Sequence, residues 1–214
     1  MGRAVKSRRA PRTRRAEQAE QTRRRILDAA TVLFTQPGYA AATIEQIAAR
    51  ADVAVETIYS RFRSKSNLLT AILDPAVVGT DDNITLLDLP ESTEIRAASD
   101  QPRQVRLMAH LSRTILERTA HIHRILKTAA FSDPKAAELQ RSDHERRYRG
   151  QLTYIDMLLA NGPLRNDTAR TNAADTYAAL ANPATYAFLT EQRGWTPSQY
   201  EDWLRDGLTL LLLP

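Results

Sequence analysis

The chain contains no cysteine, only seven glycines among its 214 residues, and few aromatic side chains. The absence of cysteine excludes disulfide bonds, thiolate metal sites and cysteine nucleophiles. Scarce glycine, together with abundant Ala, Leu and Arg, favours helices over strands. No apolar run is long enough to span a membrane, and no signal-peptide hydrophobic region is present, so we expect a cytoplasmic protein with no membrane partner.

The motifs of common enzyme classes are also missing. There is no glycine-rich phosphate loop, no nucleophile elbow and no His-Glu-x-x-His. The adjacent acids Asp81-Asp82 and Glu201-Asp202 are typical of surface charge. His121 and His123 would point to different helix faces, which argues against a shared metal site. We expect no enzymatic activity, no cofactor and no metal.

Positive charge is concentrated at the N-terminus. Residues 1–25 hold ten Lys or Arg against Glu17 and Glu20, a net of +8, and because the whole chain carries +5, the remainder carries −3. We predict a disordered basic arm over residues 1–16, because such a segment cannot bury enough apolar surface to fold. The arm either binds DNA phosphates or a minor groove, or is a solubilising tail without specific contacts.

Residues 17–75 contain the pattern that says most about function. After a predicted helix over residues 17–36, ended by Pro37-Gly38, Thr43 and Gln46 form a capping box for a short helix. That helix has one apolar stripe, made of Ile44, Ile47, Ala48 and Ala51. Asp52 interrupts it, and a second helix over about 55–61 presents polar side chains outward, suited to phosphates and base edges.

A third helix is predicted to begin after Ser64, its N-cap, and to stop at Asp74-Pro75, because a residue before proline disfavours the α conformation. The whole window therefore has the spacing of a helix-turn-helix followed by a supporting helix.

At fixed offsets, this window resembles the TetR family of bacterial transcriptional regulators. The matching positions are Gly38, Tyr39, Thr43, Ile47, Ala48, Ala51, Val53, Thr57, Ile58, Tyr59, Phe62, Ser64, Lys65, Leu68 and Leu69. The resemblance is specific over about residues 20–75, and beyond them it covers only the layout of a helical partner domain. It implies an all-α fold, with an N-terminal three-helix DNA-binding domain followed by a larger helical ligand-binding and dimerisation domain.

The resemblance also implies the DNA contacts. Thr43, Thr57, Tyr59 and Lys65 would bind phosphates, and Val55, Glu56 and Ser60 would lie near base edges. Arg61 stands where His or Tyr is frequent, and its charge could reach a phosphate. The alternative is that single members of this set are merely solvated or, for Tyr59, packed.

Three other positions depart from the family pattern. Asp52 replaces the usual turn glycine, Ala54 a capping serine, and Asn67 the glutamate that would complete a second capping box. Base preference therefore cannot be transferred from any relative.

The rest of the chain is predicted to be a linker over residues 76–102, with one short helix near 91–98, and a helical domain over 103–214. Its helices are expected at about 104–131, 134–161, 168–189 and 197–213. Asp133-Pro134 should begin the second of these, with Leu159 on its buried face, and Thr196 or Ser198 should cap the last. The charged run Arg141, Asp143, Glu145, Arg146, Arg147 and Arg149 is interpreted as a solvated helix face.

By resemblance, the C-terminal domain would hold a pocket for a small-molecule effector of unknown identity. Candidate contacts are Met108, Leu111, Ile115, Tyr148, Leu152, Ile155 and Tyr177, with His110, His121, His123 or His144 as polar partners. The same apolar residues would serve equally as ordinary core.

The family also pairs its two C-terminal helices with those of a second subunit, which makes Trp203, Leu204, Leu208 and Leu211 candidate interface residues. A last helix folded onto its own core would show the same periodicity. Function favours the dimer, since one helix-turn-helix reads only a half-site, and two-fold dimers read palindromes.

These observations favour a homodimeric, sequence-specific regulator that binds double-stranded DNA, most simply a ligand-responsive repressor on a palindromic operator. Two alternatives remain open. One is a ligand-independent, architectural DNA-binding protein that depends on the basic arm. The other is a helical small-molecule-binding protein whose arm is incidental.

Overall fold

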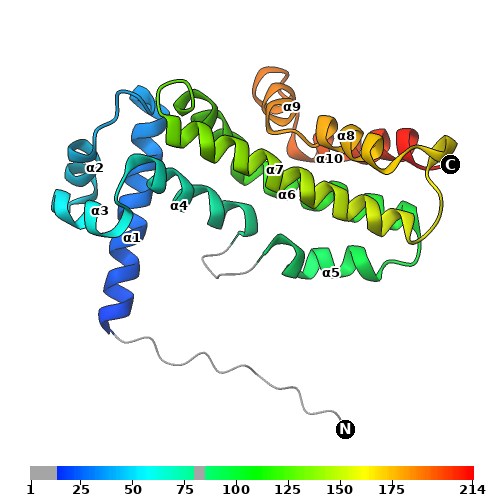
Figure 1. Cartoon of the computed structure of the whole chain (residues 1–214), viewed down its shortest axis with the longest axis horizontal. Coiled ribbons are helices and arrows are strands. Elements are labelled where there is room, and N and C mark those ends of the chain that lie inside the picture. Colours follow the sequence, from blue (N-terminus) through cyan, green and yellow to red (C-terminus); the bar gives the residue numbers. More distant parts are fainter. Residues whose placement is uncertain (1–13, 80–84) are drawn as a thin grey trace, which may run out of the picture.

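The computed structural model describes residues 14–79 and 85–214, and in this part of the chain it contains helices and no strand (Figure 1). The all-α prediction is confirmed. In chain order the elements are α1 (Arg14–Leu33), the π-turn η1 (Phe34–Gly38), α2 (Ile44–Ala51), α3 (Val55–Phe62), α4 (Lys65–Val78), the 3₁₀ turn η2 (Leu86–Asp88), α5 (Pro90–Ala97), α6 (Gln101–Ala129), α7 (Pro134–Leu159), the 3₁₀ turn η3 (Arg165–Asp167), α8 (Arg170–Leu180), α9 (Pro183–Ala187), the π-turn η4 (Phe188–Gln192) and α10 (Pro197–Leu212).

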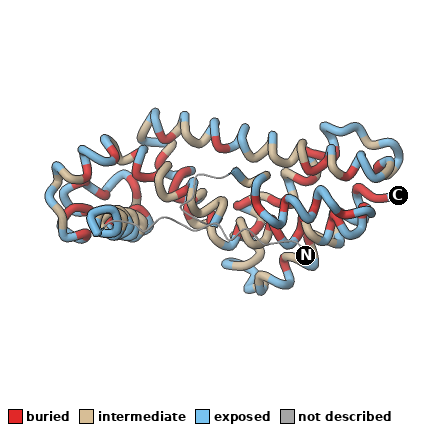
Figure 2. The backbone as a smooth tube through the Cα atoms, turned by 90° about the horizontal axis from the view of Figure 1, so that it is seen from below, coloured by how far each residue is buried: buried red, intermediate tan, exposed pale blue. Residues whose placement is uncertain are grey.

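The molecule is elongated, with α1–α3 at one end and α5, α8 and α10 toward the other (Figure 1). It has two hydrophobic cores. The first joins α1–α4, here called the N-terminal head, to the adjoining ends of α6 and α7 through Ile122, Leu126 and Ala136. The second is built from α5–α10 and includes Val105 and Met108 of α6. Because α6 contributes to both cores, it connects the two ends of the molecule. Figure 2 shows buried residues toward both ends of the molecule.

The predicted helix starts at Thr43, Ser64, Asp133 and Thr196 are confirmed. Each of these side chains accepts a hydrogen bond from a backbone N–H in the first turn of its helix. Thr43 and Gln46 form the complete capping box. Local sequence therefore defines these boundaries, because a cap satisfies N–H groups that the helix itself leaves without partners.

Two helix ends differ from the sequence predictions. Helix α4 does not stop at Asp74 but continues through Pro75 to Val78, where Gly79 ends it in a left-handed conformation. Pro75 costs the helix one N–H, but α6 stabilises the last turn, since Arg118 donates to the carbonyl oxygens of Ala76 at 2.9 Å and Val77 at 3.1 Å, which the helix end leaves without intrahelical partners.

The helix predicted over 168–189 is divided in the structure. It ends at Leu180, and a second helix begins at Pro183 with Asn182 as its N-cap, because a proline suits the first turn of a helix better than its interior.

The N-terminal boundary also moves. Helix α1 begins at Arg14, so residues 14–16 of the predicted arm belong to a helix, and the rest of that prediction lies outside the described residues. The acid pair Asp81-Asp82 lies outside them too. Within the predicted linker, α5 is well packed, with Ile95 fully buried. No described helix has the length and apolarity needed to cross a bilayer.

Candidate nucleic-acid interface and ligand cavity

Helices α2 and α3 form the predicted helix-turn-helix. Their buried sides meet through Ile47, Ala51 and Ile58 in the first core. Between them Asp52 adopts the left-handed conformation (φ 51°), where Asp is tolerated better than most residues other than glycine, and its N–H closes the end of α2 on Ala48 and Ala49. As expected from the sequence, Ala54 gives α3 no side-chain cap.

The outer face of α3 is polar and open. Glu56, Tyr59, Ser60 and Arg61 are exposed, and Tyr59 retains 48% of its accessible surface although it is a large aromatic side chain. Thr57 and Val55 are half-buried at the edges of this face. The predicted DNA-contacting residues of α3 therefore lie on the exposed side of this helix or at the edges of that side, where a DNA duplex could reach them.

The two predicted phosphate contacts outside α3 already have intramolecular partners. The Thr43 hydroxyl accepts from the Gln46 N–H at 3.2 Å. The Lys65 ammonium donates to the carbonyl oxygens of Tyr39 at 2.6 Å and Ala42 at 2.8 Å, and it lies 4.5 Å from the centroid of the Tyr39 ring. An ammonium has three donors, so Lys65 fixes the turn before α2 to α4 with two of them and has a third N–H that these two bonds do not use.

Arg61 has a partner that the sequence analysis did not foresee. Its guanidinium donates to the Ala19 carbonyl oxygen of α1 at 3.3 Å. A second contact joins the same elements, with Arg25 of α1 lying 3.6 Å from the carboxylate of Asp52. Both contacts tie α1 to the helix-turn-helix, and pairs so distant in sequence cannot be found from local spacing.

The head is also anchored to the rest of the molecule. The Tyr39 hydroxyl donates to the Asp133 carboxylate at 2.6 Å, across the corner between α6 and α7. Burial raises the pKa of Tyr39, and the nearby Asp133 carboxylate raises it further. Burial acts to raise the pKa of Asp133 too, but hydrogen bonds from Tyr39 and from backbone N–H groups outweigh it and lower that pKa. The ionised Asp133 thus both caps α7 and anchors the N-terminal head to the corner between α6 and α7.

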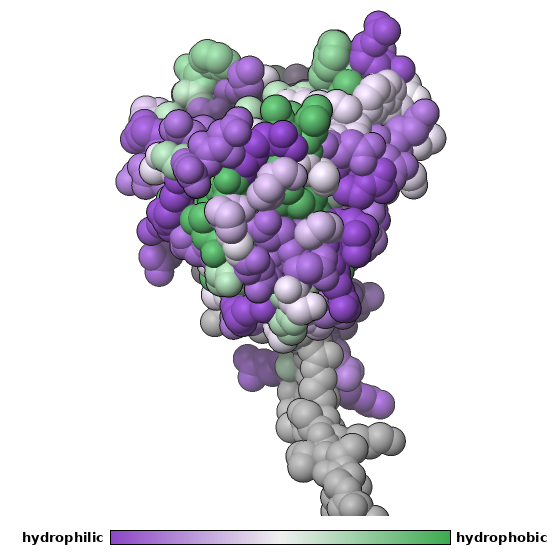
Figure 3. Space-filling view, turned by 90° about the vertical axis from the view of Figure 1, so that its right-hand side faces the viewer, coloured by the Kyte–Doolittle hydropathy of each residue, from purple (hydrophilic) through white to green (hydrophobic). Residues whose placement is uncertain are grey.

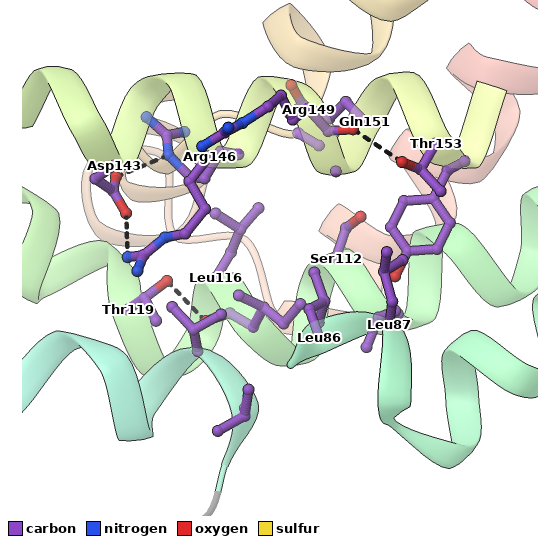
Figure 4. Close-up of a pocket in the computed structure, with 18 of the residues that line it drawn as sticks. Leu86, Leu87, Ser112, Leu116, Thr119, Asp143, Arg146, Arg149, Gln151 and Thr153 are labelled. Atoms are coloured by element: carbon purple, nitrogen blue, oxygen red, sulfur yellow. Dashed lines mark hydrogen bonds and ion pairs between the residues drawn. The ribbon is translucent and has the colours of Figure 1, made fainter. Parts of the chain in front are cut away.

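A cavity of about 580 Å³ lies between α4, α6, α7 and the segment before α5. Figure 4 shows Arg146 and Arg149 entering from α7, Ser112 and Leu116 from α6, and Leu86 and Leu87 from the segment that precedes α5. Its volume falls in the range of small-molecule sites.

Of the predicted ligand contacts, Leu111, Ile115 and Tyr177 line this cavity. The other four do not, which corrects the prediction. Met108 and Ile155 are fully buried in the second core, and Tyr148 and Leu152 pack against that core away from the cavity. Apolar periodicity identifies the inward face of a helix, but it cannot distinguish a cavity wall from solid core.

The charged run of α7 is the main correction to the sequence analysis. Asp143 is only 2% exposed and accepts hydrogen bonds from Arg146 at 3.1 Å and from Arg147 at 3.0 Å. These three residues and Arg149 line the cavity, and of the predicted solvated face Arg141, Glu145, Arg146 and Arg149 are exposed whereas Asp143 is buried. A buried carboxylate is tolerated here because two guanidinium groups and a histidine ring bond it.

His123 of α6 is the third partner of Asp143. Its Nε2 lies 3.1 Å from the carboxylate, and its Nδ1 lies 2.9 Å from the Thr119 carbonyl oxygen. The ring therefore lies between two oxygen acceptors, one on its own helix and one on α7. Burial acts to raise the pKa of Asp143, but His123 and the arginines lower it to about 2.

His123 is also the only one of the four predicted histidine contacts in the cavity wall. His110 instead bonds Glu201 at 3.1 Å, and His144 is exposed.

Two hydroxyl pairs close the apolar part of the cavity. Tyr177 and Ser112 share a hydrogen bond of 2.8 Å, and so do Tyr154 and Ser92. Both tyrosines are nearly fully buried, and burial raises the pKa of each. The phenols therefore stay neutral and already have partners, which leaves mainly apolar surface at this end of the cavity.

The candidate dimer residues of α10 divide into two groups. Leu204 and Leu208 are fully buried within one chain, so they are core residues and not surface contacts, a correction to the prediction. Trp203 is half-buried against Tyr200 and Trp195, with ring centroids 5.7 and 6.3 Å away.

Leu211 remains 48% exposed and its neighbour Leu210 67% exposed. Leu159 of α7, predicted to be buried, is 39% exposed. Apolar patches interrupt the hydrophilic surface at the end of the molecule that Figure 3 shows.

Comparisons with known proteins agree with this geometry. The model of the bacterial regulatory proteins of the tetR family matches residues 26–72. The HTH-type transcriptional regulator SrpR of Pseudomonas putida is 43% identical over 58 residues, which are 27% of this chain and 27% of SrpR. The chain thus spans about a quarter of the length of the first curated relatives it matches, and the residues matched by the family model lie in the N-terminal head.

Solved structures extend the likeness of fold to nearly the whole chain. NalD, the secondary repressor of the MexAB-OprM multidrug efflux pump in Pseudomonas aeruginosa, superposes with a TM-score of 0.66 at 21% identity, over 92% of this chain and 98% of NalD. SmeT in complex with triclosan gives 0.68 at 22% identity, over 90% and 92%. At such identities the fold alone is shared. The segment over residues 26–72, which holds the helix-turn-helix, therefore matches the tetR family of bacterial regulatory proteins, and the rest of the chain shares the fold of solved structures.

Proposed function

We propose that this protein is a ligand-responsive transcription regulator, most simply a repressor, which binds a palindromic operator as a homodimer. The observation that carries the proposal is the exposed polar face of α3, held on a capped and buried helix pair in the segment that matches the family. A rigid helix with an open row of Glu56, Tyr59 and Ser60 is suited to enter a major groove.

The residues have separate roles in this proposal. Tyr59 and the remaining donor of Lys65 bind phosphates and position the head, whereas Glu56 and Ser60 read base edges. Thr43 contributes chiefly by capping α2. Arg61 reaches a phosphate only if its guanidinium gives up its hydrogen bond to the Ala19 carbonyl oxygen.

Dimerisation would use the exposed side of α10. Two heads are needed to read both halves of a palindrome. Leu210 and Leu211 leave apolar surface uncovered in one chain, and a second copy of the chain would bury it.

Ligand response would act through α4. Asp74, Val77 and Val78 of α4 line the cavity, while Leu68, Leu69 and Leu73 of the same helix are fully buried in the core of the head. Arg118 and Arg146 connect α4 to α6 and α7. A ligand in the cavity that favours one placement of α4 over another would change the distance between the two heads of the dimer. Because the operator fits only one of these distances, the ligand would weaken operator binding.

The test is selection of genomic DNA fragments by the purified full-length chain at about 150 mM salt, near physiological ionic strength. An enriched palindrome is the expected result. Enrichment without a motif would favour an architectural binder, and no binding at low salt would leave only a small-molecule-binding protein.

Two variants separate base reading from folding. Glu56→Gln should change the preferred operator sequence, whereas Glu138→Gln, the same substitution at an exposed position of α7, should not. Tyr59→Ala should weaken binding to all sequences alike, because a phosphate contact carries no sequence information. An unchanged operator preference in Glu56→Gln would remove Glu56 from the reading surface.

A further inference from the structure

We propose that the cavity takes an amphipathic anion, with an apolar body and a carboxylate or similar head group held by the arginines of α7. This inference names the chemical class of the effector and rests on the proposed function for its regulatory meaning. The geometry of the cavity itself carries the choice of ligand.

Cationic groups outnumber carboxylates in the described cavity wall. The three arginines Arg146, Arg147 and Arg149 face only the two carboxylates of Asp74 and Asp143. Arg146 spans both carboxylates, with one terminal nitrogen 2.9 Å from Asp74 and the other 3.1 Å from Asp143. The wall therefore has an excess of positive charge that these carboxylates do not balance.

Hydrogen-bond donors also remain available on the arginines of the cavity wall. Arg147 uses its Nε for Asp143. Among residues 14–79 and 85–214, no side-chain acceptor bonds its two terminal nitrogens or any guanidinium nitrogen of Arg149. Guanidinium groups bind carboxylates through paired N–H donors, so an arginine of the cavity wall with unused donors is suited to an anionic head.

The opposite end of the cavity is apolar. Leu86, Leu111, Ile115 and Leu116 line it with the rings of Tyr154 and Tyr177, whose hydroxyls already bond serines. Arg149 is exposed and the Arg146 side chain is 49% exposed, whereas Leu111, Leu116 and Tyr177 are buried. A ligand would thus place its apolar body inward and its charge near the solvent (Figure 4).

The same groups argue against a cationic effector. Asp74 and Asp143 are both engaged by Arg146, and Asp143 has two further partners. A cation in the cavity would meet the arginines without a free carboxylate among the described wall residues to balance it.

The experiment is isothermal titration of the full-length chain with three probes of equal chain length, each below its micelle concentration: decanoate, decan-1-ol and decyltrimethylammonium. We expect decanoate to bind at least tenfold more tightly than the other two, since hydrogen bonds to charged groups exceed those between neutral groups. Equal affinity, a preference for the alcohol or the cation, or no binding of decanoate would overturn the proposal.

Variants locate the head group. Arg149→Gln should weaken decanoate binding about tenfold and leave decan-1-ol unaffected, because only the charged head loses its partner. Arg141→Gln is the matched control, an exposed arginine of the same helix outside the cavity wall. Equal effects of the two substitutions would show that decanoate is bound elsewhere or without the arginines.

Operator binding measured without probe keeps this inference distinct from the proposed function. If the chain prefers decanoate but binds no DNA, the anionic ligand class is supported and the proposed regulatory function is refuted. If the chain binds an operator but shows no preference for the carboxylate, the regulatory function is supported and the anionic ligand class is refuted.

Discussion

Replacing Asp143 by asparagine tests whether the charge cluster of α7 is part of the folded core. The substitution preserves the size of the side chain but removes the negative charge that His123, Arg146 and Arg147 share. Arg147 would then lose its carboxylate partner, and Arg146 would keep only Asp74. We therefore expect Asp143→Asn to destabilise the protein at neutral pH.

The magnitude follows from the pKa of Asp143, lowered from 3.8 to about 2. A difference of nearly two pKa units corresponds to about 2 to 3 kcal/mol. Removing one partner of a fully buried ion pair costs about 3 to 5 kcal/mol, but the Arg146 and Arg147 side chains are 49% and 28% exposed, so solvent screens part of the charge. About 2 kcal/mol is the consistent value, or about 4 to 8 °C in Tm for a chain of this size.

The effect should depend on pH with a definite sign. Because the carboxyl has a lower pKa in the folded state, its stabilisation is complete above the unfolded value of 3.8 and disappears as pH falls from there through about 2. The difference between wild type and Asp143→Asn should therefore be largest near neutral pH and shrink in that acid range.

Urea unfolding followed by circular dichroism at several pH values measures this difference. Glu117→Gln is the control, since it removes a carboxylate from a pair with Arg113 that is 48% exposed on the glutamate side, and an exposed pair contributes less than about 1 kcal/mol. The reasoning is refuted if both variants lose the same free energy of unfolding at pH 7.

Three further predictions concern the head and the dimer. Thr43→Ala should lower the free energy of unfolding by about 1 kcal/mol, because α2 loses its cap, and an unchanged urea midpoint would show that the capping box adds nothing. Lys65→Met keeps a side chain of similar length but leaves two carbonyl oxygens without their partner, so it should lower the free energy of unfolding by about 1 to 3 kcal/mol. It should also accelerate amide hydrogen exchange in the turn before α2, and exchange as slow as in the wild type would contradict this. Leu211→Glu should shift sedimentation from dimer to monomer, whereas a persistent dimer would place the interface away from α10.

The sequence by itself determined the local features of the fold. Capping side chains at Thr43, Ser64, Asp133 and Thr196 define helix starts, and they act through backbone groups only two or three residues away. The helix-turn-helix could be predicted for the same reason, since its spacing, turn and outward polarity are contained in about 30 consecutive residues.

Tertiary structure decided everything that depends on residues distant in sequence. Arg118 extends α4 past Pro75, Lys65 locks the turn before α2, and Leu208 enters the core of its own chain. Most clearly, α6 and α7 bury Asp143, one member of an otherwise largely exposed charged run, in the wall of a cavity. The physical reason is that burial and ion pairing depend on which helices pack together, and helical periodicity reports only which residues share a face.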